Sequence, residues 1–515
     1  MRNLRRFFEK AFGRITITVI FMLLQLFWLL FLVFKLQDYY IYASSVVSAL
    51  AVIMAVFVAN KRDNPAYRMG WIMLILIVPV LGVLLYAMFG HSSITKRARK
   101  KYEVNEKLFG TFFEDDTRVI EEVRQCDRQV GNICRYISQI SGYPIYRNED
   151  LAYHKMGEEG LECLKEELKK AKEFIFMEYF IVEADGKTFG EIADILEAKV
   201  KEGVEVRFLY DDIGSVAYFD KKDLKRLQAR GINVRRFNPM RSIAVAFMNN
   251  RDHRKISVID GKVGFTGGYN LADEYANIEH PFGVWKDTGI VVRGRAVDSF
   301  TAMFLAMWNS AGKKDKSFDR YFKRCKMTEP GHADGYIQPY SDTPLDHERV
   351  GEDVYLNIIK TACDYVYIYT PYLIIDNEMM SELCLAAKSG VDVRIVTPGI
   401  PDKKIIYLLT QSYYSQLMDA GVKIYQYTPG FVHAKVFVSD DEIATVGTIN
   451  LDFRSLYLHF ECGAFMYKCK AIHNIKKDFT DTFSECNEVT QEFVKNRNIF
   501  VRGFQVMLRL FAPLM

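Results

Sequence analysis

The feature that most constrains the fold is a pattern that the chain contains twice. The first copy, HRKISVIDGKVGFTGGYN, begins at His253, and the second, HAKVFVSDDEIATVGTIN, begins at His433. Each histidine is followed by Lys at +2, Asp at +7, Gly at +14 and Asn at +17. From average residue usage, one given histidine has these four followers with a probability on the order of one in 10⁵. We therefore interpret the chain as an internal duplication.

The segments before the two motifs also correspond. EFIFMEYFIVEADG, GVEVRFLYDD and RGINVRRFNP precede the first motif in the same order as DYVYIYTPYLIIDN, GVDVRIVTPG and AGVKIYQYTPG precede the second. Short β-branched and aromatic runs that alternate with helical patterns indicate βα units. The sequence thus predicts an α/β fold of two halves related by a pseudo-twofold axis, each with a mainly parallel central sheet. In that arrangement the two motifs can meet between the halves.

The two motifs resemble the HxKxxxxD signature of the phospholipase D superfamily, with its trailing GxxN. The resemblance covers about residues 140 to 515. Within that superfamily, GTINLDFRS and the apolar WIMLILIVPVLGVLLYAMFG before a basic cluster are similar to bacterial cardiolipin synthases. One departure is Gly268, where many members carry Ser, whereas the second copy has Thr448. The hydroxyl at this point is therefore present in one half only.

The residues of the paired motif suit an anionic, tetrahedral ligand. A strand carries residues i and i+2 on the same face, so each motif presents its His and Lys together. Lys ammonium and Asn amide groups can hold the non-bridging oxygens of a phosphodiester and stabilise the charge that develops in transfer. We therefore expect no metal ion and no other cofactor. The candidate residues are His253, Lys255 and Asn270 in the first half and His433, Lys435 and Asn450 in the second.

The two imidazoles have complementary expected roles. One neutral imidazole attacks phosphorus and forms a phosphohistidine, while the other, protonated, donates to the leaving oxygen and then accepts the proton of the incoming alcohol. Because the two start in opposite protonation states, we expect a bell-shaped pH-rate profile. The resemblance implies that His253 is the nucleophile and His433 the acid/base, but the symmetry of the motifs leaves the order open.

Four carboxylates accompany these histidines. A catalytic histidine needs an acceptor at its other ring nitrogen, which fixes its tautomer. Alignment of the segments that follow the two motifs places Asp287 opposite Glu461, and we predict that these two carboxylates orient the histidines. Asp260 and Asp440 belong to the catalytic motif by resemblance. Their +7 offset points away from the face that carries His and Lys, so we expect a structural role for them.

Three apolar runs, at 15–36, 41–59 and 70–89, are each close to the roughly 20 residues that span a bilayer. Basic clusters before the first run and on both sides of the third favour the cytoplasm. Two spans with an interfacial or re-entrant third run satisfy all three clusters, whereas three spans would place the catalytic part outside. The sequence leaves both topologies open. Nine scattered cysteines without a CxxC pair favour a cytoplasmic catalytic part.

These observations predict four consecutive regions. We expect a membrane anchor over 1–92, a charged helical connector over 93–140, a first phospholipase D-like half over 141–325 and a second over 326–515. The C-terminal RNIFVRGFQVMLRLFAPLM is apolar with Arg502 and Arg509 on one helical face, which suits an interfacial helix pressed onto an anionic membrane. A buried terminal helix is the alternative.

The resemblance implies a multi-pass phosphatidyltransferase of the bacterial cell membrane. The expected reaction moves a phosphatidyl group from one phosphatidylglycerol to another and yields cardiolipin and glycerol. Two alternatives remain open: an enzyme of the same type that uses water or another alcohol as acceptor, and a non-catalytic membrane scaffold. The net charge of +4 is far from the basic excess of a nucleic-acid binder. We therefore expect phospholipid and membrane as partners, and no nucleic acid.

Overall fold

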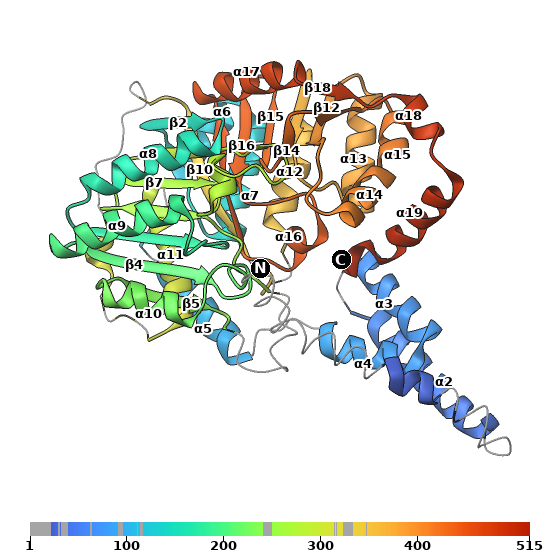
Figure 1. Cartoon of the computed structure of the whole chain (residues 1–515). Coiled ribbons are helices and arrows are strands. Elements are labelled where there is room, and N and C mark those ends of the chain that lie inside the picture. The colour runs from blue at the N-terminus through green and yellow to red at the C-terminus, as the bar shows by residue number, and fades with distance from the viewer. Residues whose placement is uncertain are drawn as a thin grey trace.

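The computed structural model shows two α/β halves side by side, with the N-terminal helices as an arm at the end of the molecule where the chain also terminates (Figure 1). It describes residues 22–28, 31, 40–61, 64–90, 96–110, 112–113, 117–239, 250–313, 315, 317–322, 333–346 and 348–514.

The first half is built around a seven-stranded sheet with the strand order β2-β9-β7-β6-β3-β4-β5. Helices and strands alternate up to β5, after which the motif region is formed by strands. The elements are β2 (Asp150–His154), α8 (Gly157–Lys170), β3 (Phe174–Tyr179), α9 (Lys187–Lys201), β4 (Glu205–Asp211), α10 (Lys221–Ala229), β5 (Asn233–Phe237), β6 (Ile256–Ile259), β7 (Val263–Gly267), β8 (Val284–Lys286), β9 (Gly289–Arg293) and α11 (Val297–Ala311).

The second half repeats this order as β10-β17-β16-β15-β11-β12-β13, with β1 and β18 added at the two edges. Its elements are β10 (Tyr336–Asp342), α12 (Val350–Thr361), β11 (Tyr365–Tyr369), α13 (Asn377–Lys388), β12 (Asp392–Pro398), α14 (Lys404–Ser412), α15 (Tyr414–Asp419), β13 (Lys423–Tyr427), β14 (Gly430–Val432), β15 (Val436–Ser439), β16 (Ile443–Gly447), α16 (Phe453–Tyr457), β17 (Glu461–Tyr467), α17 (Ala471–Phe483), β18 (Cys486–Glu488), α18 (Gln491–Lys495) and α19 (Ile499–Phe511). The shared order confirms the predicted α/β fold of two related halves.

The prediction of mainly parallel sheets was wrong, because both sheets are mixed. Among the described strands, β3, β4 and β5 are parallel, as are β11, β12 and β13, since helices connect them in βαβ units. Each motif strand instead runs antiparallel to its neighbours. β6 lies antiparallel to β3 and turns back tightly into β7, and β15 and β16 repeat this hairpin. The alternating helices that suggested parallel strands stop where the motifs begin.

One buried helix fixes the two halves against each other. α11, VDSFTAMFLAMWNSA, is apolar almost all round, and such a helix has to be buried on every side. Its Phe300 and Phe304 belong to a cluster of buried side chains that includes Phe176 of the first sheet and Ile337 and Val446 of the second. The interface that carries the site is therefore part of a continuous hydrophobic core.

The helices before the first half divide into an arm and a connector. The arm is α2 (Tyr40–Ala59), α3 (Pro65–Ile77) and α4 (Pro79–Phe89), and α2 and α4 both pack on α3. The run at 70–89 is thus split at Val78, because Pro79 cannot continue a helix. The connector is α5 (Lys96–Gly110), α6 (Thr117–Cys126) and α7 (Arg128–Ser141), followed by β1 (Tyr146–Arg147). α5 packs on α11 of the first half, whereas α7 packs on α12 of the second.

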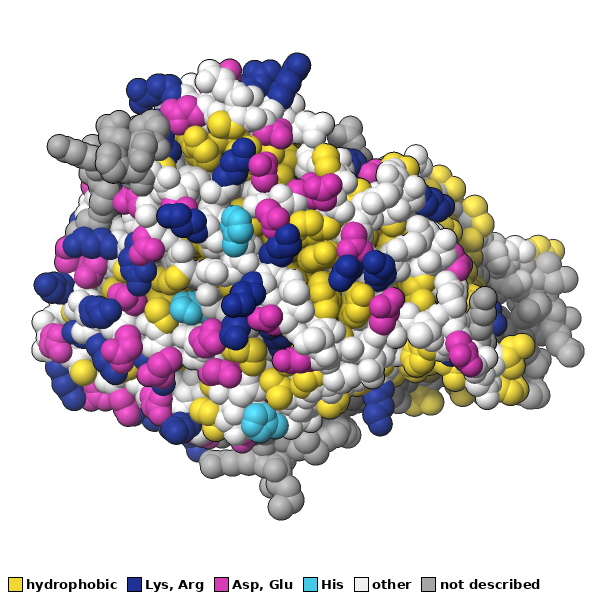
Figure 2. Space-filling model, turned by 90° about the horizontal axis from the view of Figure 1, so that it is seen from above, with side chains coloured by type: hydrophobic (Ala, Val, Ile, Leu, Met, Phe, Trp, Pro, Cys, Tyr) yellow, Lys and Arg dark blue, Asp and Glu magenta, His cyan; other side chains and the backbone are white. Residues whose placement is uncertain are grey.

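No helix among the described residues is both long and apolar enough to cross a membrane. Most of the predicted run at 15–36 lies outside the described residues. Figure 2 shows one face of the molecule, on which basic and acidic side chains are interspersed over the two halves.

Candidate active site

The two motif histidines are placed by backbone pairing across the interface between the halves. β14, directly before His433, pairs in parallel with β8 of the first half. The N–H of His433 donates to the carbonyl of Lys286 over 2.7 Å, and the N–H of His253 donates to the carbonyl of Phe460 over 2.9 Å. Each histidine is therefore in register with the residue just before the carboxylate of the other half.

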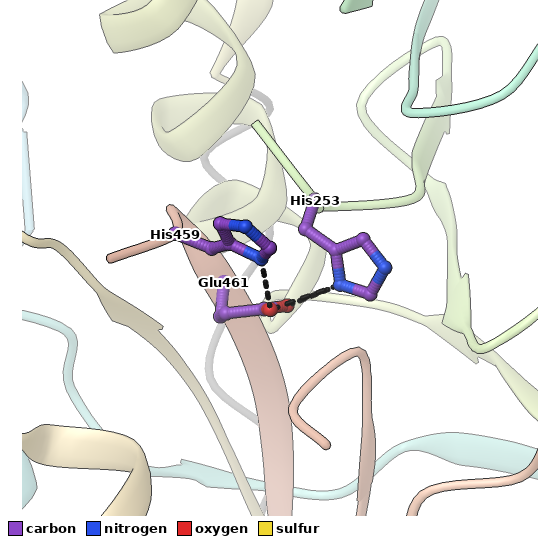
Figure 3. A group of neighbouring side chains, drawn as sticks. All are labelled: His253, His459 and Glu461. Atoms are coloured by element: carbon purple, nitrogen blue, oxygen red, sulfur yellow. Dashed lines mark hydrogen bonds and ion pairs between the residues drawn. The ribbon is translucent and has the colours of Figure 1, made fainter. Parts of the chain in front are cut away.

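This register brings each imidazole onto the carboxylate of the opposite half. His253 Nδ1 lies 2.9 Å from Glu461 Oε1, and His433 Nδ1 lies 2.6 Å from Asp287 Oδ2. Figure 3 shows the first pair, with Nδ1 of His253 turned towards Glu461 and the other ring nitrogen turned away. Both carboxylates are fully buried. An Nδ1–H that donates to a carboxylate leaves the Nε2 lone pair free for chemistry.

The lysines and asparagines of both motifs are buried, as the histidines are. The ammonium groups of Lys255 and Lys435 each donate to the carbonyl of the histidine in their own motif. The Asn270 amide oxygen accepts from the N–H of Ile181 over 3.0 Å, and its NH₂ group has no hydrogen-bond partner among the described residues. The amide oxygen of Asn450 likewise has none there. These amide atoms therefore have hydrogen-bonding capacity left for a ligand.

The charges of the site are strongly perturbed by burial. Burial lowers the pKa of His253 and of His433 well below the usual value, and the two nearby lysines lower it further. Burial also lowers the pKa of Lys255 to about 8 and that of Lys435 to about 7, and it raises the pKa of Asp287 to about 7. All these pKa shifts favour the uncharged form of the histidine, lysine or aspartate concerned. A bound phosphodiester anion would reverse them for the cations.

The two carboxylates differ in their surroundings. The hydroxyl of Thr448 donates to Glu461, so this carboxylate is held by a side chain as well as by His253. At the matching position, a Cβ on Gly268 would lie only 2.0 Å from Asp287 Oδ1. Asp287 instead accepts from the N–H of Thr288 over 2.8 Å. Position 268, where the sequence departs from many family members, is therefore a glycine because the Asp287 carboxylate occupies the space that a side chain would need.

Sequence reasoning missed the residues that precede the two carboxylates by two positions. His459 Nδ1 lies 3.6 Å from Glu461 Oε1, and the His459 ring centroid lies 5.5 Å from that of His253 (Figure 3). The corresponding residue of the first half, Trp285, packs on His433 with 5.5 Å between ring centroids. No strand pattern marks His459 in the sequence, because it lies in the bend before β17.

Asp260 and Asp440 do not lie with the histidines. Each sits after its motif strand with positive φ, 53° for Asp260 and 52° for Asp440. Asp260 accepts three backbone N–H bonds of 2.7 to 2.9 Å from residues 172–174 at the start of β3. Asp440 accepts three of 2.7 to 3.0 Å from residues 363–365 at the start of β11. These bonds tie each motif hairpin to the neighbouring strand.

Replacement of Asp260 by asparagine is expected to destabilise the protein rather than to remove its chemistry. Asparagine tolerates the positive φ but faces three N–H donors with only one acceptor oxygen, which costs about 1–3 kcal/mol. The thermal midpoint of the purified protein should fall by about 1–3 °C. Asp185→Asn, at a side chain that is 74% exposed, is the matched control and should melt like the wild type. Lost activity at an unchanged melting temperature would instead give Asp260 a chemical role.

Comparison with known proteins places the chain in a family. The model described as "Cardiolipin synthase, PLD-like domain" matches residues 164–308 and 355–483, one segment in each half. The model "Phospholipase_D-nuclease N-terminal" matches residues 49–91, within the arm. The fold and the paired motifs thus define an enzyme of the phospholipase D type. The chain belongs to the family of phospholipase D-like cardiolipin synthases, and it is a phosphatidyltransferase.

Individual relatives agree with this assignment. A cardiolipin synthase of Alkalihalophilus pseudofirmus is 33% identical over 93% of this chain and 95% of its own length. Cardiolipin synthase 2 of Bacillus anthracis is 34% identical over 91% of this chain and 90% of its own. An uncharacterized protein of Streptococcus mutans is 43% identical over 89% of this chain and 99% of its own. The crystal structure of phosphatidylserine synthase from Haemophilus influenzae covers 74% of this chain and 98% of its own with a TM-score of 0.56 at 13% identity, which shows a shared fold.

Proposed function

We propose that the protein is a cardiolipin synthase that transfers a phosphatidyl group from one phosphatidylglycerol to another. The observation that carries the proposal is the crosswise arrangement of the site: each motif histidine is oriented by the carboxylate of the other half. Two oriented imidazoles, one to attack and one to move a proton, are what a two-step transfer at phosphorus requires. The relatives named cardiolipin synthase support cardiolipin as the product.

In the first step, Nε2 of His253 attacks the phosphorus of a bound phosphatidylglycerol. The bond between phosphorus and the headgroup glycerol oxygen breaks, and protonated His433 donates its Nε2 proton to that oxygen, so that free glycerol leaves. The phosphatidyl group is now bonded to His253. The positive ring is stabilised by the Nδ1–H that it donates to Glu461.

In the second step, the headgroup hydroxyl of another phosphatidylglycerol attacks the phosphohistidine. His433 takes the hydroxyl proton, the bond between phosphorus and His253 breaks, and cardiolipin is released. Lys255, Lys435 and the amide groups of Asn270 and Asn450 hold the non-bridging oxygens in both steps. One phosphodiester replaces another, so the cycle consumes no nucleotide and returns each histidine to its initial protonation state.

The proton needed for the first step can be taken up from solvent when the substrate binds. In the site without ligand, burial and two lysines keep the pKa of both histidines low, so both rings are neutral. A phosphodiester anion opposes that effect and favours one imidazolium. We therefore expect one of the two histidines to become protonated when the substrate binds. The position of the bound ester then decides which histidine acts as the acid.

The proposed membrane attachment uses the membrane anchor predicted over 1–92 and the C-terminal helix. On α19, Ile499, Phe500 and Val506 are 77%, 83% and 64% exposed, while Gln505 and Leu508 on its other face are buried. Exposed apolar side chains along one face of a helix suit insertion at the lipid boundary. Figure 1 places the end of α19 beside α3 of the arm, so both would meet the same bilayer, with the two halves, 141–325 and 326–515, on its cytoplasmic side.

Phosphatidylglycerol as the only lipid should suffice to test the proposed function. The full-length protein, purified in detergent, is expected to convert it to cardiolipin and to release one glycerol per cardiolipin formed. Lipid mass spectrometry and an enzymatic glycerol assay measure the two products. Release of glycerol with phosphatidic acid in place of cardiolipin would show that water is the acceptor, and the absence of any turnover would contradict the proposal altogether.

A further inference from the structure

The interface between the halves holds a cluster of three buried potential metal ligands, His253 of the first half with His459 and Glu461 of the second. One nitrogen of each histidine and one carboxylate oxygen lie within 4.8 Å of one another. Figure 3 shows both rings facing the same carboxylate from different sides. His459 is nine-tenths buried, and neither of its ring nitrogens makes a hydrogen bond among the described residues, although Nδ1 lies 3.6 Å from Glu461 Oε1.

The distances suit a tetrahedral ion with small adjustments. A zinc ion with bonds of about 2.0–2.1 Å separates neighbouring ligand atoms by about 3.3 Å. The His253 Nδ1 and His459 Nδ1 atoms lie 2.9 and 3.6 Å from Glu461 Oε1, on either side of that value. The hydroxyl of Thr448 holds the other carboxylate oxygen, as an outer partner of a metal ligand does. The first half has Trp285 where the second has His459, so this arrangement is not repeated there.

A polar cavity leads to this cluster from the side of the arm. Its volume is about 610 Å³, and it lies between residues of the arm and the second half, with His459 in its wall. Its wall carries both acidic and basic side chains, namely Asp342, Asp346, Glu348, Glu378, Lys61, Arg99 and Arg349. An ion can therefore reach His459 while still hydrated, and water in the cavity can supply the remaining ligand.

We propose that His253, His459 and Glu461 bind a divalent transition-metal ion such as Zn²⁺, and that the bound ion inhibits the enzyme. The inhibition rests on the proposed role of His253 as nucleophile. A metal on Nδ1 uses the lone pair of that nitrogen, so the ring proton moves to Nε2. An Nε2–H cannot attack phosphorus. The ion thus blocks the reaction by selecting the wrong tautomer, without contacting the substrate.

Zinc titration of the full-length, chelator-treated protein in detergent tests this inhibition. Cardiolipin formation is expected to fall with rising Zn²⁺ and to return when EDTA is added. Because the Lys255 ammonium lies near the cluster and repels a dication, we expect half-inhibition in the micromolar range. His459→Gln removes one ligand and should raise the half-inhibitory concentration at least tenfold. His473→Gln, at an exposed histidine of α17, is the matched control and should behave like the wild type.

Cobalt binding separates a failure of this inference from a failure of the proposed function. Co²⁺ in a site of low coordination absorbs visible light, so the wild type should show an absorption band that His459→Gln lacks and His473→Gln retains. This measurement needs no turnover. Equal inhibition of wild type and His459→Gln, or a cobalt band that survives the substitution, would overturn the inference even if cardiolipin is made. A protein that binds cobalt as expected but makes no cardiolipin would contradict the proposed function only.

Discussion

Replacement of His253 by alanine is expected to reduce cardiolipin formation by a factor of about 10³ or more, because the residue supplies the proposed nucleophile. His433→Ala should cause a loss of similar size, since the leaving glycerol oxygen then receives no proton and the acceptor hydroxyl loses none. Initial rates with phosphatidylglycerol in detergent measure both effects. His473→Ala, on the exposed side of α17, should leave the rate unchanged.

The covalent intermediate distinguishes the two histidines. A brief pulse of phosphatidylglycerol followed by denaturation and peptide mass spectrometry should find a phosphatidyl group on His253, and His253→Ala should abolish the adduct. In His433→Ala the adduct should form slowly and persist, because the acceptor is no longer activated. An adduct on His433 alone would reverse the two roles. A rapid reaction without any adduct would contradict the phosphohistidine mechanism.

Glu461→Gln is expected to lower the turnover number by about 10²–10⁴ with little effect on folding. The glutamine amide fills the same space, but its NH₂ group can donate to Nδ1 of His253. The ring then carries its proton on Nε2, the nitrogen that has to attack. Asp287→Asn should act on His433 in the same way, although the residue belongs to the other half. Each substitution therefore impairs a histidine that is far away in the sequence.

Three measurements separate this orienting role from a general loss of structure. The thermal midpoints of both variants should stay close to that of the wild type, and the pH dependence of the rate should change shape because the tautomer equilibrium has changed. Glu461→Asp and Asp287→Glu keep the charge and should lose less than the amide variants. Glu166→Gln, an exposed carboxylate on α8, serves as the control. Amide variants as active as the wild type would show that the carboxylates do not orient the histidines.

The duplication and the members of each motif could be predicted from the sequence, because the spacing of a repeated pattern is independent of the fold. The prediction that His253 and Lys255 lie on a strand was wrong, because β6 begins at Ile256 and both residues lie in the segment before it. The prediction of mainly parallel sheets failed because periodicity does not reveal the direction of the neighbouring strand. β6 and β7 form an antiparallel hairpin whose turn carries Asp260. The alternating helices and strands before it do not indicate that the connection changes from a helix to a hairpin.

The pairing of each histidine with the carboxylate of the other half could not be predicted from the sequence, for a different reason. Alignment placed Asp287 opposite Glu461, but alignment compares equivalent positions and does not say which half each carboxylate serves. The answer depends on the register between β8 and β14, which is set by packing between the halves. His459 was missed because a histidine two positions before a carboxylate has no meaning until the strand is known to face the site.

The connector has a consequence for the time at which the protein can finish folding. Its α6 and α7 bury Val123, Ile133 and Ile137 against the second half, and β1 pairs with β10, although the whole first half lies between them in the sequence. At the usual rate of synthesis, β10 leaves the ribosome roughly 10–40 seconds after β1. During that interval the first half can fold, whereas the apolar faces of α6 and α7 have no second half to pack against. The apolar side chains of α6 and α7 therefore stay exposed on the nascent chain until the second half has been synthesised.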